Sequence, residues 1–376
     1  MAAVLVRKQQ DMKFVLNTTN PDSAAALACI QGLAQQLLAL GHEATINDWN
    51  NYGRYDVAIF MAADADCAVV RAANQNILIG VADPKPTTEK QAREADFCIV
   101  SSIEQREVFM PLNRNQFIYY MIPNFEATPV HHAAKKLHRI VYHGNKVHLN
   151  GSYHGLVPAL NELGRKYPIQ FDVIYNIQVL GHWTMGRPDP RYCPTRDLQW
   201  YPDCYKTYFA DADIGVVQNL MPWRQEGLVR RLGVVSRSLL LESTYDHIAK
   251  YKSSANAGRA FVFGYFGIPV VADAIPSTSD AIVDGHSGRL VLTAEGWYDA
   301  LEELILSPGR RQQLADNFRR SIDERFAPAV SARRLVDFVS GIQPKSIVMP
   351  RQSPPAVLPE LWRATRLRIE RRFKRG

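Results

Sequence analysis

The segment 252–288, KSSANAGRAFVFGYFGIPVVADAIPSTSDAIVDGHSG, constrains the fold of this chain more than any other. It begins with a polar, cationic loop, continues as a predicted helix over 256–266, and then becomes an apolar run over 268–272. Such a run is typical of a strand that is buried on both faces of a parallel sheet. A second polar loop follows at the carboxyl end of that strand, the edge where open α/β sheets bind ligands. The segment therefore predicts a parallel α/β domain with a ligand site at the edge of its sheet.

Polar groups in both loops of this segment suit a bound anion. Amide groups at the start of a helix and nearby cations stabilise negative charge, and the guanidinium of Arg259 has the geometry for bidentate contact with a phosphate. A glycine turn after the predicted strand 139–143 would let backbone amides approach the same group. The candidate phosphate and sugar ligands are Lys252, Ser253, Ser254, Arg259, Ser277, Thr278, Gly144 and Asn145. Each has an ordinary structural alternative, such as a solvated arginine, an N-cap hydroxyl or a plain turn glycine.

Predicted strands and helices alternate along the chain, which is the pattern of a parallel α/β sheet. The predicted strands are 13–17, 44–47, 56–61, 77–82, 96–100 and 117–122 in the first half, and 139–143, 171–175, 212–217, 268–272 and 289–292 in the second. The predicted helices are 24–40, 153–165, 203–210, 227–240, 256–266, 296–306, 308–324 and 328–341. A polar stretch over 126–136 separates the halves, so we expect two domains that face each other across one cleft.

Several motifs follow one another in an order that resembles the GT-B glycosyltransferases, particularly those of the family-four type. The first predicted helix is followed by Gly41-His42-Glu43, and residues 122–124 read Ile-Pro-Asn. The other matching motifs are the glycine turn over 142–145, the strand over 212–216 and the segment 252–288. Each motif is weak alone, and their common order is what makes the resemblance specific.

The resemblance implies an α/β GT-B fold with two Rossmann-like domains. It also implies a glycosyltransferase that moves a sugar from a nucleotide-activated donor to a glycan or lipid-linked acceptor, as in surface polysaccharide or glycoconjugate synthesis. On this comparison the acceptor domain spans 12–128, the donor domain spans 137–325, and a helix over 328–341 crosses back to the acceptor domain. The nucleotide sugar is a substrate, and the resemblance implies neither a cofactor nor a bound metal ion.

The chain departs from this family where its chemistry is usually read. Retaining family-four enzymes commonly carry two glutamates before the strand G-x-P-V-V, and Ser254 and Val262 stand at those positions here. Asn145 and Asn150 replace two cations, while Trp200 fits the place of an aromatic residue near the donor base. The stereochemical outcome, retaining or inverting, is therefore open. Two alternatives are open as well: a catalytically silent GT-B protein that binds a glycan or nucleotide, and a GT-B sugar epimerase, which would need acids from both domains.

An inverting mechanism needs a general base on the first domain. Asp83 and Asp64 follow predicted strands of that domain, so both are candidate catalytic carboxylates at the edge of the cleft. Both are alternatively turn-forming aspartates. Asn17, Thr18 and Thr19 replace the glycine-rich first loop that is typical of the fold, and they are candidate contacts for acceptor hydroxyls.

The segments at the two ends of the chain have their own character. Residues 1–11 read as a disordered extension, and 342–376 as a proline-rich linker followed by a basic tail. Residues 360–376 hold seven cations and two glutamates, which accounts for +5 of the formal net charge of +7. Apolar residues recur there every four positions, so the tail predicts an amphipathic basic helix suited to an anionic membrane surface. Docking on the protein itself is the alternative, and nucleic acid is not expected because no nucleic-acid-binding motif accompanies the charge.

The composition agrees with a cytoplasmic protein, and the basic tail predicts a peripheral position at the inner face of the cytoplasmic membrane. Hydrophobic residues make up 47% of the chain and charged residues 22%, which is ordinary for a globular protein. The five cysteines form no C-x-x-C pair, so we expect reduced thiols in place of a metal site or a disulfide framework. The N-terminal region has too short an apolar run for a signal peptide, and no window suits a membrane span.

Overall fold

A computed structural model describes residues 11–122, 127–202, 204–222, 249–251 and 255–345. Several sequence predictions lie outside these residues. They are the extension over 1–11 except for its last residue, the helix over 227–240, the tail beyond Lys345, and the candidate ligands Lys252, Ser253 and Ser254. These remain predictions.

The first half of the chain forms a parallel sheet in the order β2-β1-β3-β4-β5-β6. Its strands are β1 (Lys13–Asn17), β2 (Glu43–Ile46), β3 (Val57–Met61), β4 (Leu78–Ala82), β5 (Phe97–Val100) and β6 (Gln116–Ile118). Its helices are α1 (Ala24–Ala26), the π-helical η1 (Leu27–Gly32), α2 (Leu33–Ala39), α3 (Cys67–Ala73), α4 (Glu89–Glu94) and α5 (Ile103–Phe109). Alternate residues of a strand serve opposite faces, so Phe14 and Leu16 pack against η1 and α2, whereas Val15 packs on the other face.

The second half forms another parallel sheet, in the order β14-β13-β10-β7-β8-β9. Its strands are β7 (His138–His143), β8 (Ile169–Tyr175), β9 (Thr195–Gln199), β10 (Ile214–Val217), β13 (Val270–Asp273) and β14 (Arg289–Val291). Strand β9 was not predicted, because its sequence TRDLQ lacks the apolar run of a buried strand and lies at the sheet edge. A short antiparallel pair, β11 (Leu220–Pro222) and β12 (Ala249–Tyr251), stands apart from this sheet.

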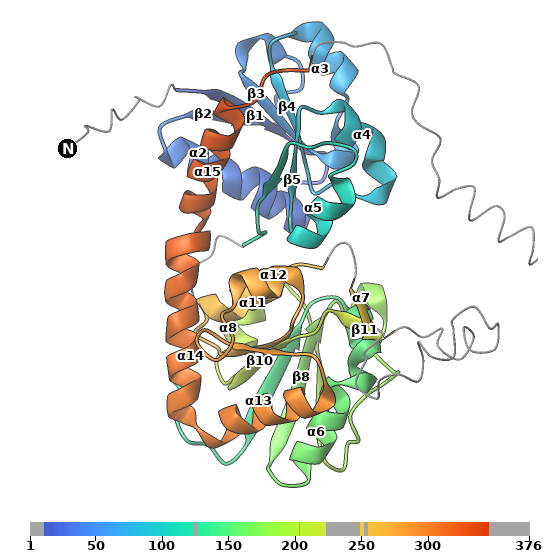
Figure 1. Ribbon diagram of the computed structural model, residues 1–376, viewed down its shortest axis with the longest axis vertical. Coiled ribbons are helices and arrows are strands. Elements are labelled where there is room, and N and C mark those ends of the chain that lie inside the picture. The colour runs from blue at the N-terminus through green and yellow to red at the C-terminus, as the bar shows by residue number, and fades with distance from the viewer. Residues whose placement is uncertain (1–10, 123–126, 203, 223–248, 252–254, 346–376) are drawn as a thin grey trace, which may run out of the picture.

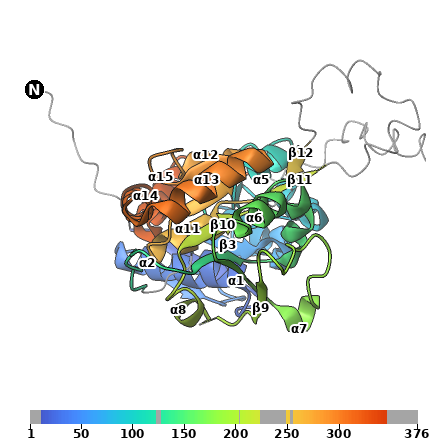
Figure 2. The same ribbon diagram turned by 90° about the horizontal axis from the view of Figure 1, so that it is seen from below.

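Helices cover both faces of the second sheet. They are the 3₁₀ segment η5 (Lys146–His154), α6 (Leu156–Gly164), α7 (Ile177–Leu180), α8 (Cys204–Tyr208), α11 (Gly258–Tyr265), α12 (Pro276–Ala281), α13 (Ala294–Leu306) and α14 (Pro308–Ser321). Helices α6 and α13 share one buried core with the sheet, and α8 and α11 share the core on the opposite face. Figure 2 shows α6 and α13 on one side of β10 and α8 on the other. Both sheets are thus sandwiched by helices, as the sequence predicted.

The end of the described chain returns to the first sheet. We call the first sheet with its helices the first body and the second sheet with its helices the second body. After α14 and the π-helical η6 (Ile322–Phe326), helix α15 (Pro328–Ser340) runs along the side of the molecule toward the first body (Figure 1). Its buried residues Ala332, Leu335, Val336 and Val339 join the core that contains Phe14 and Leu33. The two sheets are therefore connected twice, once by the segment after β6 and once by α15.

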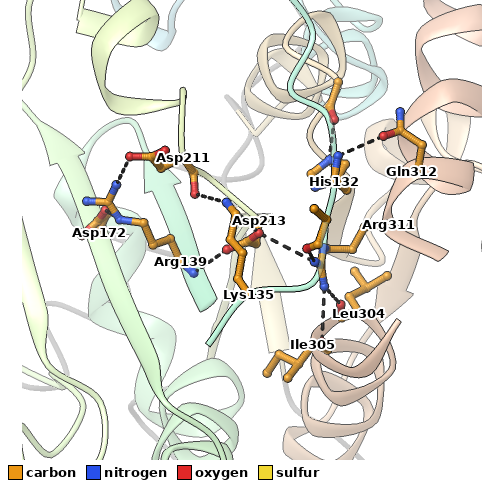
Figure 3. Close-up of polar contacts among 12 residues, drawn as sticks. His132, Lys135, Arg139, Asp172, Asp211, Asp213, Leu304, Ile305, Arg311 and Gln312 are labelled. Carbon is orange, nitrogen blue, oxygen red and sulfur yellow. Dashed lines mark hydrogen bonds and ion pairs between the residues drawn. The ribbon is translucent and has the colours of Figure 1, made fainter. Parts of the chain in front are cut away.

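The first of these connections is fastened to the second body by buried charges (Figure 3). Arg311 of α14 is fully buried and donates hydrogen bonds to the carbonyl oxygens of Leu304 and Ala133, the latter at 2.7 Å. The carboxylate of Asp213, also fully buried, lies 3.2 Å from the ammonium of Lys135 and 3.8 Å from the guanidinium of Arg311. Asp213 precedes β10, so this cluster lies at the amino end of that strand and away from its carboxyl edge.

Candidate functional site

The carboxyl edges of the two sheets meet each other. The backbone N–H of Ile103, at the start of α5, donates to the hydroxyl of Ser277 in α12 at 3.1 Å. The hydroxyl of Tyr120 donates to the carboxylate of Asp280 at 2.7 Å. Figure 1 shows α5 directly above α12. Because the strands of each sheet are parallel, the described loops that follow them emerge at this interface.

A cavity of about 420 Å³ opens between the two bodies. The first body contributes small and apolar residues of α1 and η1, including Ala25 and Ala28. The second body contributes Trp200, Tyr205 and Arg259, and the indole N–H of Trp200 donates to the hydroxyl of Tyr205 at 2.9 Å. Most ligand sites combine an apolar wall with a few polar groups. This cavity has that character.

Arg259 is the cation in the wall of the cavity. It lies in the first turn of α11, and its guanidinium donates to the hydroxyl of Tyr142 at 3.0 Å and to the side-chain oxygen of Asn219. The guanidinium carbon is 5.5 Å from the centroid of the Tyr142 ring. No described carboxylate forms an ion pair with Arg259, and the side chain is partly exposed. A guanidinium held in this way keeps N–H donors for an anion.

The glycine turn lies against Arg259. Gly144 has a φ of +128°, and a Cβ atom there would lie 2.8 Å from Cδ of Arg259. Both the positive φ and the close approach of Arg259 favour glycine at this position. The neighbouring Asn145 uses its side-chain oxygen to accept the backbone N–H of Val147 at 3.0 Å, so this oxygen caps η5.

Two buried titratable residues, His143 and Asp273, lie near Arg259. His143 lines the cavity wall, and burial lowers its pKa to about 3, so the imidazole is neutral at physiological pH. Its Nε2 lies 3.1 Å from the carbonyl oxygen of Arg259. Burial raises the pKa of Asp273 to about 6, although its carboxylate accepts the backbone N–H groups of Asn219 and Leu220, each at 2.7 Å.

Ser277 and Thr278 do not open into the cavity. Both side chains are fully buried. The hydroxyl of Ser277 bonds to Glu104 of the first body, and the hydroxyl of Thr278 accepts the backbone N–H of Ile275 at 3.1 Å. The prediction of ligand-contacting hydroxyls here does not fit this arrangement, because the opposing domain and the helix cap already use them.

The candidate residues of the first body also lie at the carboxyl edge of their sheet. Asp83 adopts a left-handed backbone with φ of +52°, is 8% exposed, and accepts bonds from Lys85 at 2.6 Å and Gln105 at 3.1 Å. Non-glycine residues in this conformation store strain that often marks functional sites. Asp64 instead accepts both the backbone N–H of Thr19, at 3.0 Å, and its hydroxyl, at 2.6 Å. Asp64 therefore anchors the loop that holds Thr19.

Asn17 and Thr18 are buried residues whose hydrogen bonds hold the same loop in place. Asn17 is fully buried and its amide group donates to the hydroxyl of Tyr52 at 3.3 Å. The backbone N–H of Thr18 donates to the side chain of Asn47 at 2.8 Å, and the Thr18 side chain is 2% exposed. Of the three predicted acceptor contacts, only Thr19 is exposed.

Sequence reasoning missed Tyr142, Asn219 and Glu104. Asn219 follows β10 by two residues, so the rule that polar residues after a strand line the site would have found it. Tyr142 lies within an apolar strand and resembles a core residue. Glu104 lies in a charged helix and resembles a solvated residue. Among the described residues, no group of three or more His, Cys, Asp and Glu side chains is placed to hold a metal ion.

The fold resembles solved structures of GT-B glycosyltransferases. A glycosyltransferase from Rickettsia africae ESF-5 matches 88% of this chain and 100% of its own, with 10% identity and a TM-score of 0.52. A sucrose-phosphate synthase from Thermosynechococcus elongatus matches 88% of this chain and 98% of its own, with 12% identity and a TM-score of 0.52. The apo form of the lipopolysaccharide outer core galactosyltransferase WaaB matches 88% of this chain and 99% of its own, with 12% identity and a TM-score of 0.50.

Sequence comparison finds less. No protein-family model matches the chain, and no curated protein matches it. The chain spans 54% of TarM, a longer protein that it matches with 13% identity and a TM-score of 0.48. At such identities the likeness is one of fold, and in that sense the chain has the GT-B fold. Within the described residues, no helix combines the length and apolar character that a membrane crossing needs.

Proposed function

We propose that this chain is a glycosyltransferase that moves a sugar from a nucleotide-activated donor to a glycan or lipid-linked acceptor, in the synthesis of a surface polysaccharide or glycoconjugate. The observation that carries the proposal is the position of Arg259. Its guanidinium lies in the wall of a cavity between two Rossmann-like bodies, beside a glycine turn and without a described carboxylate partner. A guanidinium and backbone N–H groups in such a position favour the binding of a diphosphate.

In the proposed site the donor has one orientation. Its diphosphate contacts Arg259 and the backbone around Gly144, while its nucleoside lies against the apolar wall that contains Trp200 and Tyr205. Negative charge grows on the diphosphate as the bond to the sugar breaks. A fixed cation at that position stabilises the leaving group in the transition state. The proposed chemistry needs no metal ion or cofactor.

Asp83 is the proposed general base if the reaction inverts the sugar configuration. It is nearly buried at the carboxyl edge of the first sheet, and Lys85 and Gln105 hold its carboxylate in one orientation. Asp64 is less suited to the role, because both of its oxygens are bonded to Thr19. We therefore propose Asp83 for catalysis and Asp64 for holding the acceptor loop.

One observation favours a second candidate function, a GT-B protein that binds nucleotides or glycans without catalysis. Val262 lines the cavity at a position where the resemblance implies a glutamate. A protein of this kind would bind the donor and leave it intact. An epimerase has less support, since Asp273 on the second body is fully buried.

A panel of nucleoside diphosphates (UDP, GDP, ADP and CDP) and their sugar conjugates tests the donor site. We expect one nucleotide to raise the melting temperature, and Arg259→Ala to reduce the shift and weaken binding while leaving a dissociation constant that can still be measured. Arg319→Ala is the matched control, because Arg319 is a partly buried arginine of α14 that contacts Tyr265 and Asp323 instead of the cavity. No shift with any nucleotide in the unaltered protein would refute the donor site. Hydrolysis or transfer of the bound nucleotide sugar separates the enzyme from the silent binder.

We also propose that the basic tail binds the inner face of the cytoplasmic membrane. The support is the net positive charge of residues 360–376 and the recurrence of apolar residues there at every fourth position. Lys345 is bound to the first body through its backbone N–H, which donates to Asp96 at 2.6 Å, and its ammonium, which donates to the carbonyl oxygen of Arg93 at 2.9 Å. A chain that ends at Lys345 keeps this anchor. It should lose binding to vesicles that contain anionic lipid, and unchanged binding would refute the proposal.

A further inference from the structure

Arginine is a long and flexible side chain, so an anion site gains from groups that fix its guanidinium before the ligand arrives. In this structure such groups come from the ends of two neighbouring strands. Tyr142 is the penultimate residue of β7, and Asn219 follows β10. Strands β7 and β10 pair directly, so the two side chains are held by one rigid sheet.

The orientation of Asn219 is settled by its partner. The guanidinium of Arg259 can only donate hydrogen bonds, so the side-chain oxygen of Asn219 must face it. The backbone of Asn219 is fixed in turn, because its N–H donates to the buried carboxylate of Asp273. The amide nitrogen of the Asn219 side chain has no hydrogen-bond partner in the described part of the chain, although the residue is fully buried. A buried amide with an unused donor is costly for stability alone.

The orientation of the Tyr142 hydroxyl is also fixed by its hydrogen bonds. Its proton is donated to the carbonyl oxygen of Asn145 at 2.8 Å, so a lone pair faces the N–H of Arg259 at 3.0 Å. Burial raises the pKa of Tyr142, which keeps the hydroxyl protonated. The ring lies beside the guanidinium carbon, at 5.5 Å from the ring centroid. Two acceptors and one ring therefore limit where the guanidinium can lie.

We propose that Asn219 and Tyr142 are positioning residues that hold Arg259 in place for the diphosphate of the donor. The proposal rests on the function proposed above and adds two residues to its site. Each takes one N–H of a different terminal nitrogen of the guanidinium, which leaves the remaining N–H groups for a phosphate. Neither residue has to touch the ligand, because both act through Arg259.

A double-mutant cycle tests this dependence. Asn219→Ala and Tyr142→Phe should each raise the dissociation constant for the nucleoside diphosphate that stabilises the unaltered protein by roughly tenfold, the factor that corresponds to about 1.4 kcal/mol. In the background of Arg259→Ala the same changes should have no further effect. Equal effects in both backgrounds would show independent structural roles and overturn the proposal. Tyr142→Phe removes a single oxygen, so it keeps the test decisive if Asn219→Ala fails to fold.

A second measurement needs no ligand. In protein labelled with [¹⁵N]arginine, the guanidinium of Arg259 should show slow rotation about its C–N bonds, and either single variant should speed it. The Arg319 guanidinium serves as the internal control and should not change. Slow rotation that both variants leave unaltered would refute the positioning role. If no nucleotide binds but the variants still free Arg259, the positioning holds and the proposed donor site fails.

Discussion

Glu104 of the first body binds Ser277 of the second through both of its carboxylate oxygens. One oxygen accepts the backbone N–H of Ser277 at 3.0 Å, and the other accepts its hydroxyl. Glu104 is 4% exposed and Ser277 is fully buried. A carboxylate of the first body therefore binds the start of α12 in the second body. These two hydrogen bonds help to fix the position of one body relative to the other.

Glu104→Ala should loosen this interface. The change leaves the N–H of Ser277 without its acceptor, which costs about 1–3 kcal/mol for a group that stays buried. We therefore expect a lower free energy of unfolding in urea and a larger radius of gyration by small-angle X-ray scattering. Glu107→Ala is the matched control on the same helix, since the Glu107 side chain is 61% exposed and, among the residues that the structure describes, forms an ion pair with Arg106 only. A Glu104 variant that behaves like this control would contradict the coupling.

Gly144→Ala should damage the donor site and the fold together. The residue has a φ of +128°, and the new methyl group would lie 2.8 Å from Cδ of Arg259, so both the backbone and the arginine must move. We expect a loss of about 1–3 kcal/mol in stability and weaker binding of the nucleotide. Gly285→Ala separates the two effects, because its φ is +70° and a Cβ atom there would lie no nearer than 4.0 Å to Nη2 of Arg310. It should cost stability and leave nucleotide affinity unchanged.

His143 should make stability fall in mild acid. Burial lowers its folded-state pKa from 6.5 to about 3. Between these pH values the imidazole is protonated in the unfolded chain but not in the folded protein. The stabilisation is complete above pH 6.5 and is lost as the pH falls toward 3. Between pH 6.5 and 4.5 the unaltered protein should lose about 2 kcal/mol relative to His143→Phe, as urea unfolding at both pH values would measure. Asp273, whose raised pKa acts in the opposite direction, is present in both proteins. Parallel pH profiles for the two proteins would contradict the assignment.

The sequence predicted the layout of the sheets because most strands are short apolar runs. Ile77–Ala82 consists of apolar residues and glycine, and β4 forms there. The same rule fails for β9, where Arg196 and Asp197 stand in an edge strand whose side chains need no burial. Arg259 was a candidate from the sequence because the helix start and the arginine are close in sequence.

The rest of the site depends on contacts between distant segments. Ser277 has the local signal of a ligand-binding hydroxyl, and only the position of the other body shows that Glu104 bonds to it instead. Tyr142 and Asn219 meet Arg259 from positions 117 and 40 residues away in sequence. Local pattern contains no information about such pairs. The sequence thus predicted that the candidate residues lie at the carboxyl edges of the sheets, but it could not predict which side chains contact one another there.

Arg311→Met should unfold the protein more readily than any surface change, because it removes one partner from a buried set of charges. Arg311 and Asp213 (Figure 3) are both fully buried. The guanidinium also donates to the carbonyl oxygen of Ala133 in the connection between the bodies. Without the guanidinium, Asp213 retains Lys135 at 3.2 Å as its remaining ion-pair partner among the described residues. Breaking a buried pair from one side costs about 3–5 kcal/mol.

A second change then separates charge from packing. Asp213→Asn combined with Arg311→Met removes both charges, so the double variant should lose less stability than the sum of the single changes. Arg320→Ala, an exposed arginine of the same helix that contacts Asn317, is the control and should stay within about 0.5 kcal/mol. Because Arg311 holds Ala133, the amides of 127–137 should also exchange faster in the Met variant. Unchanged exchange there, together with additive losses, would mean that the connection is held by its apolar contacts and that the buried charges contribute little.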